Sequence, residues 1–113
     1  MKDDRLYLIH IRECIERIRR YTAGGRPAFF AEEMIRDAVV RNLQVLTEST
    51  QRLSESMKDQ WPETDWRGIA GFRNVAVHGY LGVDLEQVWT IVERDLRPLE
   101  RAVHEMLESL EAQ

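Results

Sequence analysis

Apolar residues recur at intervals of three or four along most of this chain, the spacing of one face of an α-helix. The pattern predicts a first helix over residues 4–21, which ends at a Gly-Gly-Arg-Pro stretch that turns the chain at 24–27. A short helical turn around Phe29 and Phe30 follows, and then a long second helix over about residues 32–58. No segment alternates in the manner of a strand pair, so we expect an all-α protein.

A short third helix is predicted after a break at residues 60–63. Asp65 is a good N-cap for a helix over residues 66–78, because its carboxylate can accept from a free backbone N–H of the first turn. Gly79 fits as the residue that stops this helix.

The fourth helix has the most regular apolar period of the chain. Asp84 and Gln87 resemble a capping box at its start, and Pro98 should kink it by removing one backbone hydrogen bond. Three long amphipathic helices and a short one predict an antiparallel, up-and-down bundle of four to five helices. We expect this bundle to form one domain over residues 1–113.

Composition narrows the possible functions. The 16 Lys and Arg and 20 Asp and Glu give a net charge of −4, which argues against a broad basic surface for long nucleic acid. A small local phosphate site is still compatible with this charge. The single cysteine, Cys14, and a charged N-terminus without an apolar leader favour a reducing cytoplasm. No apolar run is long enough to span a bilayer, so we expect no membrane partner.

Metal chemistry is not expected. One cysteine and three scattered histidines give no spacing of zinc ligands, and we predict neither a metal nor another cofactor. The histidines are His10, His78 and His104.

The candidate chemistry lies in one stretch, residues 73–80. It reads Arg73-Asn74-Val75-Ala76-Val77-His78-Gly79-Tyr80. On a helical wheel Arg73, Asn74 and His78 share one side, spread over roughly 140° of arc. Arginine offers a rigid fork of donors to phosphate, and histidine is suited to proton transfer.

Each of these residues also has a structural explanation. Trp66, Ala70 and Val77 define the expected inward stripe of the third helix, and Arg73 falls on it. Arg73 could therefore pair with a carboxylate such as Asp37 or Glu48, since a buried guanidinium needs a partner. His78 could cap the helix C-terminus, and Tyr80 could simply pack. The residues alone favour the functional and structural explanations about equally.

The stretch from Trp66 to Tyr80 resembles the signature of the HepT-like toxins, members of the HEPN superfamily (higher eukaryotes and prokaryotes nucleotide-binding). Residues 83–89 and 95–99, and the earlier run 36–43 followed by Glu48, are also similar to that family. The resemblance covers nearly the whole chain. One departure is Val45-Leu46-Thr47-Glu48-Ser49, where the family usually has more Gly and Ala.

This resemblance implies a fold, an activity and a partner. It implies a homodimeric helical bundle in which two Arg-x4-His motifs line a cleft at or near the dimer interface. It also implies metal-independent cleavage of RNA. The implied partner is a minimal nucleotidyltransferase (MNT) antitoxin that can transfer AMP to the motif tyrosine, here Tyr80, and so silence the toxin.

Under this hypothesis the motif residues have separate roles. His78 transfers protons, Arg73 stabilises the charged phosphorane, and Asn74 orients His78 or holds a phosphate oxygen. A second His78, from the other protomer, could supply the complementary acid or base. Tyr80 contacts RNA and accepts AMP.

Two other classes of function stay open. The chain could be a non-enzymatic binding or acceptor subunit of a nucleotidyltransferase complex, and its acidic charge slightly favours this alternative. It could also be a purely structural helical dimer, in which case Arg73 and His78 would matter for neither RNA nor growth.

Overall fold

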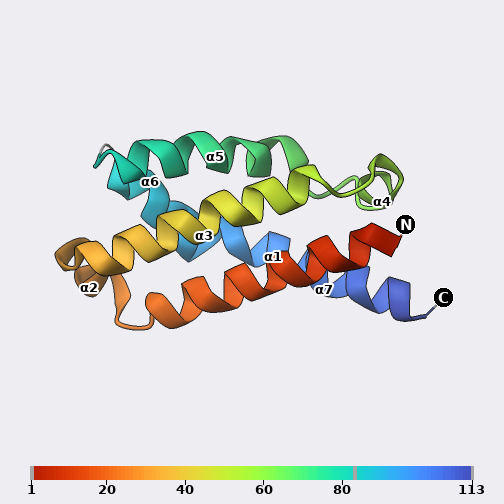
Figure 1. Cartoon of the computed structure of the whole chain (residues 1–113), viewed down its shortest axis with the longest axis horizontal. Helices are drawn as coiled ribbons and strands as arrows, with labels where there is room; N and C mark the ends of the chain where they lie inside the picture. The colour runs from red at the N-terminus through yellow and green to blue at the C-terminus, as the bar shows by residue number, and fades with distance from the viewer. Residues whose placement is uncertain (1, 83, 113) are drawn as a thin grey trace.

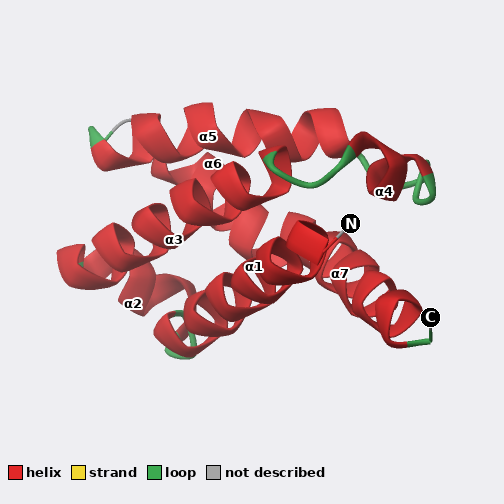
Figure 2. Cartoon of the chain, turned by 45° about the vertical axis from the view of Figure 1, so that its right-hand side comes forward, coloured by secondary structure: helices red, strands yellow, loops and turns green. Residues whose placement is uncertain are grey.

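The chain folds as a set of long helices that run alternately in opposite directions (Figure 1). The structure is a computed structural model that describes residues 2–82 and 84–112. Its helices are α1 (Lys2–Tyr21), α2 (Gly25–Ala31), α3 (Glu33–Gln51), α4 (Glu55–Asp59), α5 (Trp66–Tyr80), α6 (Leu85–Thr90), the π-helical η1 (Ile91–Asp95) and α7 (Leu96–Glu111). Loops join these helices and no strand occurs within the described residues (Figure 2). The predicted all-α, up-and-down architecture is confirmed. Val83, the first residue of one stretch that matches the HepT-like pattern, lies outside the described residues.

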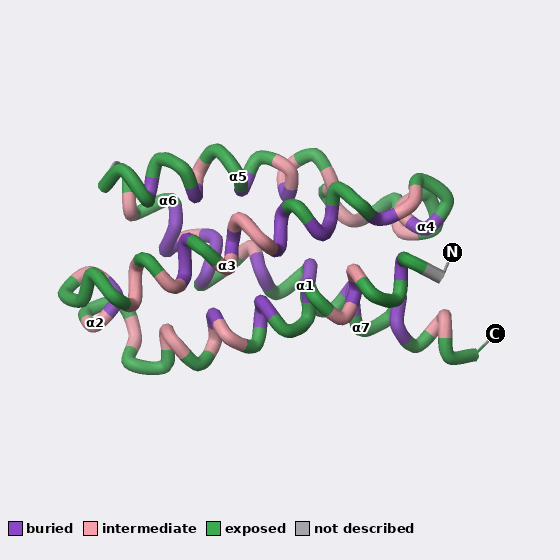
Figure 3. The backbone as a smooth tube through the Cα atoms, viewed as in Figure 1, coloured by how far each residue is buried: buried purple, intermediate pink, exposed green. Residues whose placement is uncertain are grey.

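Helix α3 lies at the centre of the arrangement. It packs against α1 on one side and against α5 on the other, and α1 also packs against α7. The molecule is elongated, 45 × 23 × 21 Å. Because α5 packs on the side of α3 away from α1, it lies at the outer edge of the bundle. Much of its surface is exposed (Figure 3).

The core is a cluster of apolar side chains to which all the long helices contribute. Its largest fully buried members are Phe29, Leu8, Ile11, Ile15, Ile18, Leu43, Leu46, Leu96, Leu99, Met106, Val39 and Val40. Cys14 lies within this cluster, 1% exposed. Burial raises the pKa of its thiol, so the side chain stays neutral and inert at neutral pH.

The predicted second helix over residues 32–58 is wrong, because the chain breaks after Gln51. Ser54 is extended and its Oγ accepts from the N–H of Met57, which starts the separate helix α4. Buried Asp4 fixes this break from α1: its carboxylate accepts from Ser54 N at 2.8 Å and from Ser54 Oγ at 2.7 Å. The spacing of apolar residues in the sequence could not predict these polar contacts.

Helix α5 begins as predicted and continues further than predicted. Asp65 caps it by accepting from Gly68 N at 2.9 Å. Gly79 does not stop the helix, which runs to Tyr80. Instead Gly79 is a point of close packing: a Cβ there would lie 2.7 Å from Val88 Cγ2 and 3.2 Å from Val40 Cγ2.

The capping box predicted at Asp84 does not form. Asp84 has a left-handed backbone (φ 60°, ψ 50°), whereas an N-cap residue is normally extended, and its side chain accepts no bond from the helix backbone. The side-chain amide of Gln87 donates to the Asp84 carboxylate instead. An ion pair between Arg26 and Glu86 joins α2 to α6, and the hydrogen bond from Arg26 lowers the pKa of Glu86.

The long C-terminal helix is interrupted just ahead of Pro98, where a kink was predicted. The interruption is the π-helical turn η1, which contains Arg94. In a regular helix the carbonyl group of Arg94 would accept from the backbone N–H of residue 98, which proline lacks. Trp89 is buried as expected and packs against Phe29, with ring centroids 5.2 Å apart. Among the described residues its indole Nε1 has no hydrogen-bond partner.

Gly71 and Gly79, two of the three glycines of α5, should respond in opposite ways to the same substitution. Gly79→Ala forces a methyl group against Val88 and Val40, and we expect it to lower the free energy of unfolding by about 1–3 kcal/mol. Gly71→Ala is the matched control, because its Cβ meets nothing within 4 Å. It should raise the free energy by about 0.5–1 kcal/mol through helix propensity. Urea denaturation followed by circular dichroism measures both, and equal stabilities would contradict the packing described here.

Candidate functional site

The inward stripe predicted for α5 is wrong. The buried residues of this helix are Ile69, Phe72, Ala76 and Gly79. They lie roughly 110° around the helix axis from the predicted stripe through Trp66, Ala70 and Val77. The larger apolar surfaces of Ile69 and Phe72 turn inward, and the small residues Ala76 and Gly79 let α5 approach α3 and α6 closely.

This rotation exposes every predicted site residue. Arg73, Asn74, His78 and Tyr80 all lie on the solvent side of α5. Tyr80 is 70% exposed, so its hydroxyl is accessible from solution. Exposure removes the expectation that Arg73 needs a buried partner.

Arg73 borders a shallow hollow between α5 and α3. The hollow has a volume of about 350 Å³ and is lined by Thr47, Glu48, Gln51, Arg52 and Arg73. Within the described residues Arg73 forms no ion pair with Glu48 or with Asp37, so its guanidinium donors are available to a ligand. Two arginines against one glutamate leave the hollow positively charged, which suits an anionic group.

Arg52 was missed by the sequence analysis. It lies beside Arg73 in space although 21 positions separate them, since the antiparallel packing of α3 and α5 brings them together. The sequence placed Arg52 inside an unbroken helix, where it looked like any other solvated charge. A prediction that the helix ends near Gln51 would have drawn attention to it.

Tyr80 borders a separate hollow near the start of α3. This one has a volume of about 330 Å³ and is lined by Glu33, Arg36, Asp37, Gly79, Tyr80 and Gly82. Arg36 is used structurally there, because its Nη1 donates to the carbonyl oxygen of Phe30 at 2.6 Å. Along the helix axis Tyr80 lies about 10 Å, or two turns, from Arg73.

His78 and Asn74 line neither hollow. In the part of the chain that the structure describes, neither side chain forms a hydrogen bond or an ion pair. Both are presented to solvent, four positions apart on one face of α5. The single chain therefore presents its motif on an open surface instead of enclosing it in a cleft.

Apolar side chains accompany the motif on this surface. Val77 is 40% exposed, Leu81 67% and Met34 84%. Val77 and Leu81 flank His78 and Tyr80 in sequence, and Met34 follows Glu33, which lines the Tyr80 hollow. Exposed large apolar side chains beside a functional site indicate a contact surface for another molecule.

Two classes of site find no support in the described residues. They contain no group of three or more His, Cys, Asp or Glu side chains placed to hold a metal ion. Among residues 2–82 and 84–112, no helix has both the length and the apolar character that crossing a membrane requires.

The exposure of the motif predicts that its residues contribute little to folding. We expect Arg73→Ala and His78→Ala each to change the free energy of unfolding by no more than about 0.5 kcal/mol. Phe72→Ala, one position away but buried, should cost about 3–5 kcal/mol. Chemical denaturation of the three variants measures the difference, and a large loss for Arg73→Ala would mean that its role is structural.

Comparison with known proteins places this site in a family. The sequence model of the family described as ribonuclease HepT-like matches residues 11–106. That range includes every motif residue and the two hollows beside them. No solved structure matches the chain.

Several curated proteins are similar over most of the chain. The "Probable ribonuclease HepT" of Thermococcus cleftensis is 32% identical over 82% of this chain and 86% of its own length. The "Putative RNase" of Caldanaerobacter subterraneus subsp. tengcongensis is 30% identical over 96% of this chain and 97% of its own length. A "Gamma-glutamylcyclotransferase and putative RNase" of Methanocaldococcus jannaschii is 31% identical over 97% of this chain, which spans only 50% of that larger protein. The chain belongs to the HepT-like ribonuclease family.

Proposed function

We propose that this chain is a metal-independent endoribonuclease, the cytoplasmic toxin of a HEPN/MNT toxin–antitoxin system. The observation that carries the proposal is the exposed Arg-x4-His motif of a HepT-like ribonuclease, with Arg73 free of ion pairs to described residues beside a positively charged hollow. The names of the relatives support ribonuclease activity. The pairing with an antitoxin rests on the resemblance to the HepT-like toxins.

The reaction needs one proton removed, one proton supplied and negative charge stabilised at phosphorus. The RNA 2′-oxygen loses its proton and forms a bond to the adjacent phosphorus, and the bond from phosphorus to the 5′-oxygen breaks. His78 transfers one of these protons. The guanidinium of Arg73 donates to the equatorial oxygens of the phosphorane, where negative charge develops. Asn74, four positions before His78 on the same face, orients the imidazole or holds a phosphate oxygen.

A second copy of the chain completes the site in this proposal. Each protomer has one motif histidine, whereas the reaction uses both a base and an acid. Pairing the outer faces of two α5 helices would bring two His78 side chains to one cleft and would cover Val77 and Leu81. In a single chain the motif is open to water. Pairing two chains would exclude water from it, which strengthens the electrostatic interactions that catalysis uses.

Tyr80 is the proposed point of control. Its hydroxyl is accessible, which a nucleotidyltransferase requires of an acceptor. AMP added there would place a bulky anion at the end of the motif helix, about two turns from Arg73. The modification would fill the cleft and repel the phosphates of RNA.

One alternative function is favoured by specific observations. The net charge of −4 and the acidic side chains beside Tyr80 fit an acceptor subunit that binds a nucleotidyltransferase and cuts nothing. On that alternative Tyr80 would still gain AMP. Cleavage of RNA by unmodified protein separates the two functions.

Purified, unmodified protein should cleave single-stranded or transfer RNA in the presence of EDTA. We expect His78→Ala to lower kcat/KM by about 10²–10⁴-fold, because it removes a proton-transfer group. Arg73→Ala should lower it by about 10²–10³-fold, because it removes stabilisation of the phosphorane. Gel analysis of labelled RNA gives these rates. The matched controls are His10→Ala and Arg20→Ala, which remove exposed residues of the same types from α1 and should leave the rate unchanged. Full activity of the His78→Ala protein would overturn the proposed mechanism.

Co-expression with the proposed MNT-type nucleotidyltransferase should add AMP-sized mass to the protein. The intact mass spectrum should show the addition in the wild type and lose it in Tyr80→Phe, which keeps the ring and removes the acceptor oxygen. Tyr7→Phe is the control, since Tyr7 is half-buried on α1. The modified protein should no longer cleave RNA. Addition that persists in Tyr80→Phe would place the acceptor elsewhere.

A further inference from the structure

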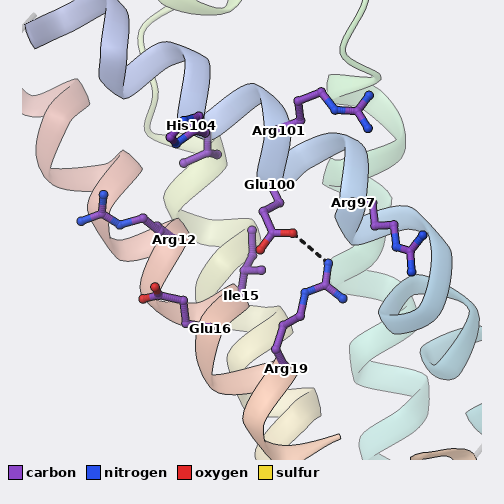
Figure 4. Close-up of a pocket in the computed structure, with 9 residues that line it drawn as sticks. Arg12, Ile15, Glu16, Arg19, Arg97, Glu100, Arg101 and His104 are labelled. Carbon is purple, nitrogen blue, oxygen red and sulfur yellow. Dashed lines mark hydrogen bonds and ion pairs between the residues drawn. The ribbon is translucent and has the colours of Figure 1, made fainter. Parts of the chain in front are cut away.

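A groove on another part of the molecule is larger than either hollow of the motif surface. It has a volume of about 600 Å³ and contains none of the four motif residues. It runs between α1 and α7 (Figure 4). The residues that line it are Arg12, Ile15, Glu16, Arg19, Arg97, Glu100, Arg101, Val103 and His104.

The groove is a basic region on an acidic protein. Its lining carries four arginines and two glutamates, a net charge of 4 − 2 = +2. The whole chain has 16 basic and 20 acidic side chains, so the remainder carries 12 − 18 = −6. A separation of charge of this kind directs a polyanion to one place on the surface.

Most of the arginines there are not neutralised by the protein. Arg19 Nη2 pairs with Glu100 Oε1 at 2.9 Å, and His104 Nε2 lies 3.4 Å from Glu108 Oε1. Arg12, Arg97 and Arg101 form no ion pair with any described residue. Three exposed guanidiniums are thus available to an external ligand.

The arrangement of these charges suits a chain of anions better than a single anion. Arg12 and Arg19 are about 10 Å apart along α1, and Arg97 and Arg101 about 6 Å apart along α7. Figure 4 shows the side chain of Arg12 directed to one side of the view, and those of Arg97 and Arg101 directed to the opposite side. Guanidiniums that diverge in this way cannot close around one small ion, but each can contact a different phosphate of an extended strand.

We propose that the α1–α7 groove binds the phosphate backbone of RNA at a second site, separate from the Arg-x4-His motif. The choice of RNA over other polyanions rests on the proposed ribonuclease function. Helix α3 separates α1 from α5, so the groove and the motif lie on different parts of the bundle. The groove therefore holds a distant part of a long RNA and takes no part in the chemistry.

The test compares two pairs of substitutions in the His78→Ala background, which binds without cutting. Arg97→Gln/Arg101→Gln removes two charges from the groove. Arg20→Gln/Arg26→Gln removes two exposed charges that line none of the hollows described above, and so matches the change in net charge. Fluorescence anisotropy with labelled transfer RNA, over a range of salt concentrations, gives the dissociation constant and its salt dependence.

The groove variant should bind transfer RNA about tenfold more weakly at low salt. The slope of log K against log salt should become shallower by about 1.4–1.8, because each lost phosphate contact removes about 0.7–0.9. The control pair should keep the wild-type affinity and slope. Equal losses in the two pairs would mean that only net charge matters, and no loss in the groove pair would mean that RNA does not bind there. Either result overturns the proposal. A groove variant that binds RNA as the wild type does but binds the nucleotidyltransferase more weakly would also overturn it, because the groove would then be a binding site for a protein.

Cleavage assays separate this proposal from the ribonuclease function. For these assays the same substitutions are made in protein that keeps His78. The groove pair should raise KM for transfer RNA and leave kcat unchanged, and it should cleave a short oligonucleotide at the wild-type rate. If no protein of the set cleaves RNA, the ribonuclease function fails while the anisotropy measurements still decide whether the groove binds RNA. A fall in kcat on the short substrate would contradict a binding role remote from the chemistry.

Discussion

The packing of α5 against α3 and α6 determines which side of this helix carries the candidate motif. Ile69 and Phe72 turn inward, and Gly79 leaves no space for a side chain between the helix and Val88 and Val40. A helix held at this contact has one rotation about its axis. That rotation carries Arg73, Asn74, His78 and Tyr80 to the outside, although only apolar and small residues are involved in setting it. The positions of the polar motif residues are thus set by apolar and small residues of the same helix.

The sequence was sufficient for the fold class, for the start of α5 and for the segment that carries the motif. Helical period and the Asp65 cap are local signals, and local signals can be recognised without a structure. The rotation of α5 could not be predicted, because Trp66, Ala70 and Val77 make an apolar stripe as plausible as that of Ile69 and Phe72. The break after Gln51 depends on Asp4, 50 positions before Ser54. The hollow shared by Arg52 and Arg73 depends on the same long-range pairing of helices.

Two surfaces of the bundle have different physical characters. The motif surface combines exposed apolar side chains with a few free polar groups, which suits a partner that packs closely. The α1–α7 groove has four arginines against two glutamates in its lining, which suits a ligand held by charge and readily released. An elongated bundle can keep two such surfaces apart because α3 lies between them. Outside this groove the side chains of the protein are acidic overall.

The up-and-down course of the helices has a consequence for how this fold can be joined to others. The first turn of α1 and the last turn of α7 lie at the same end of the bundle, and Tyr80 at the tip of α5 lies at the opposite end (Figure 1). A domain fused at either terminus would extend the molecule away from that tip without covering it. The relative from Methanocaldococcus jannaschii, twice the length of the match, shows that larger proteins contain a region of this kind. In such a fusion the bundle can act as a self-contained module whose Tyr80 end stays free.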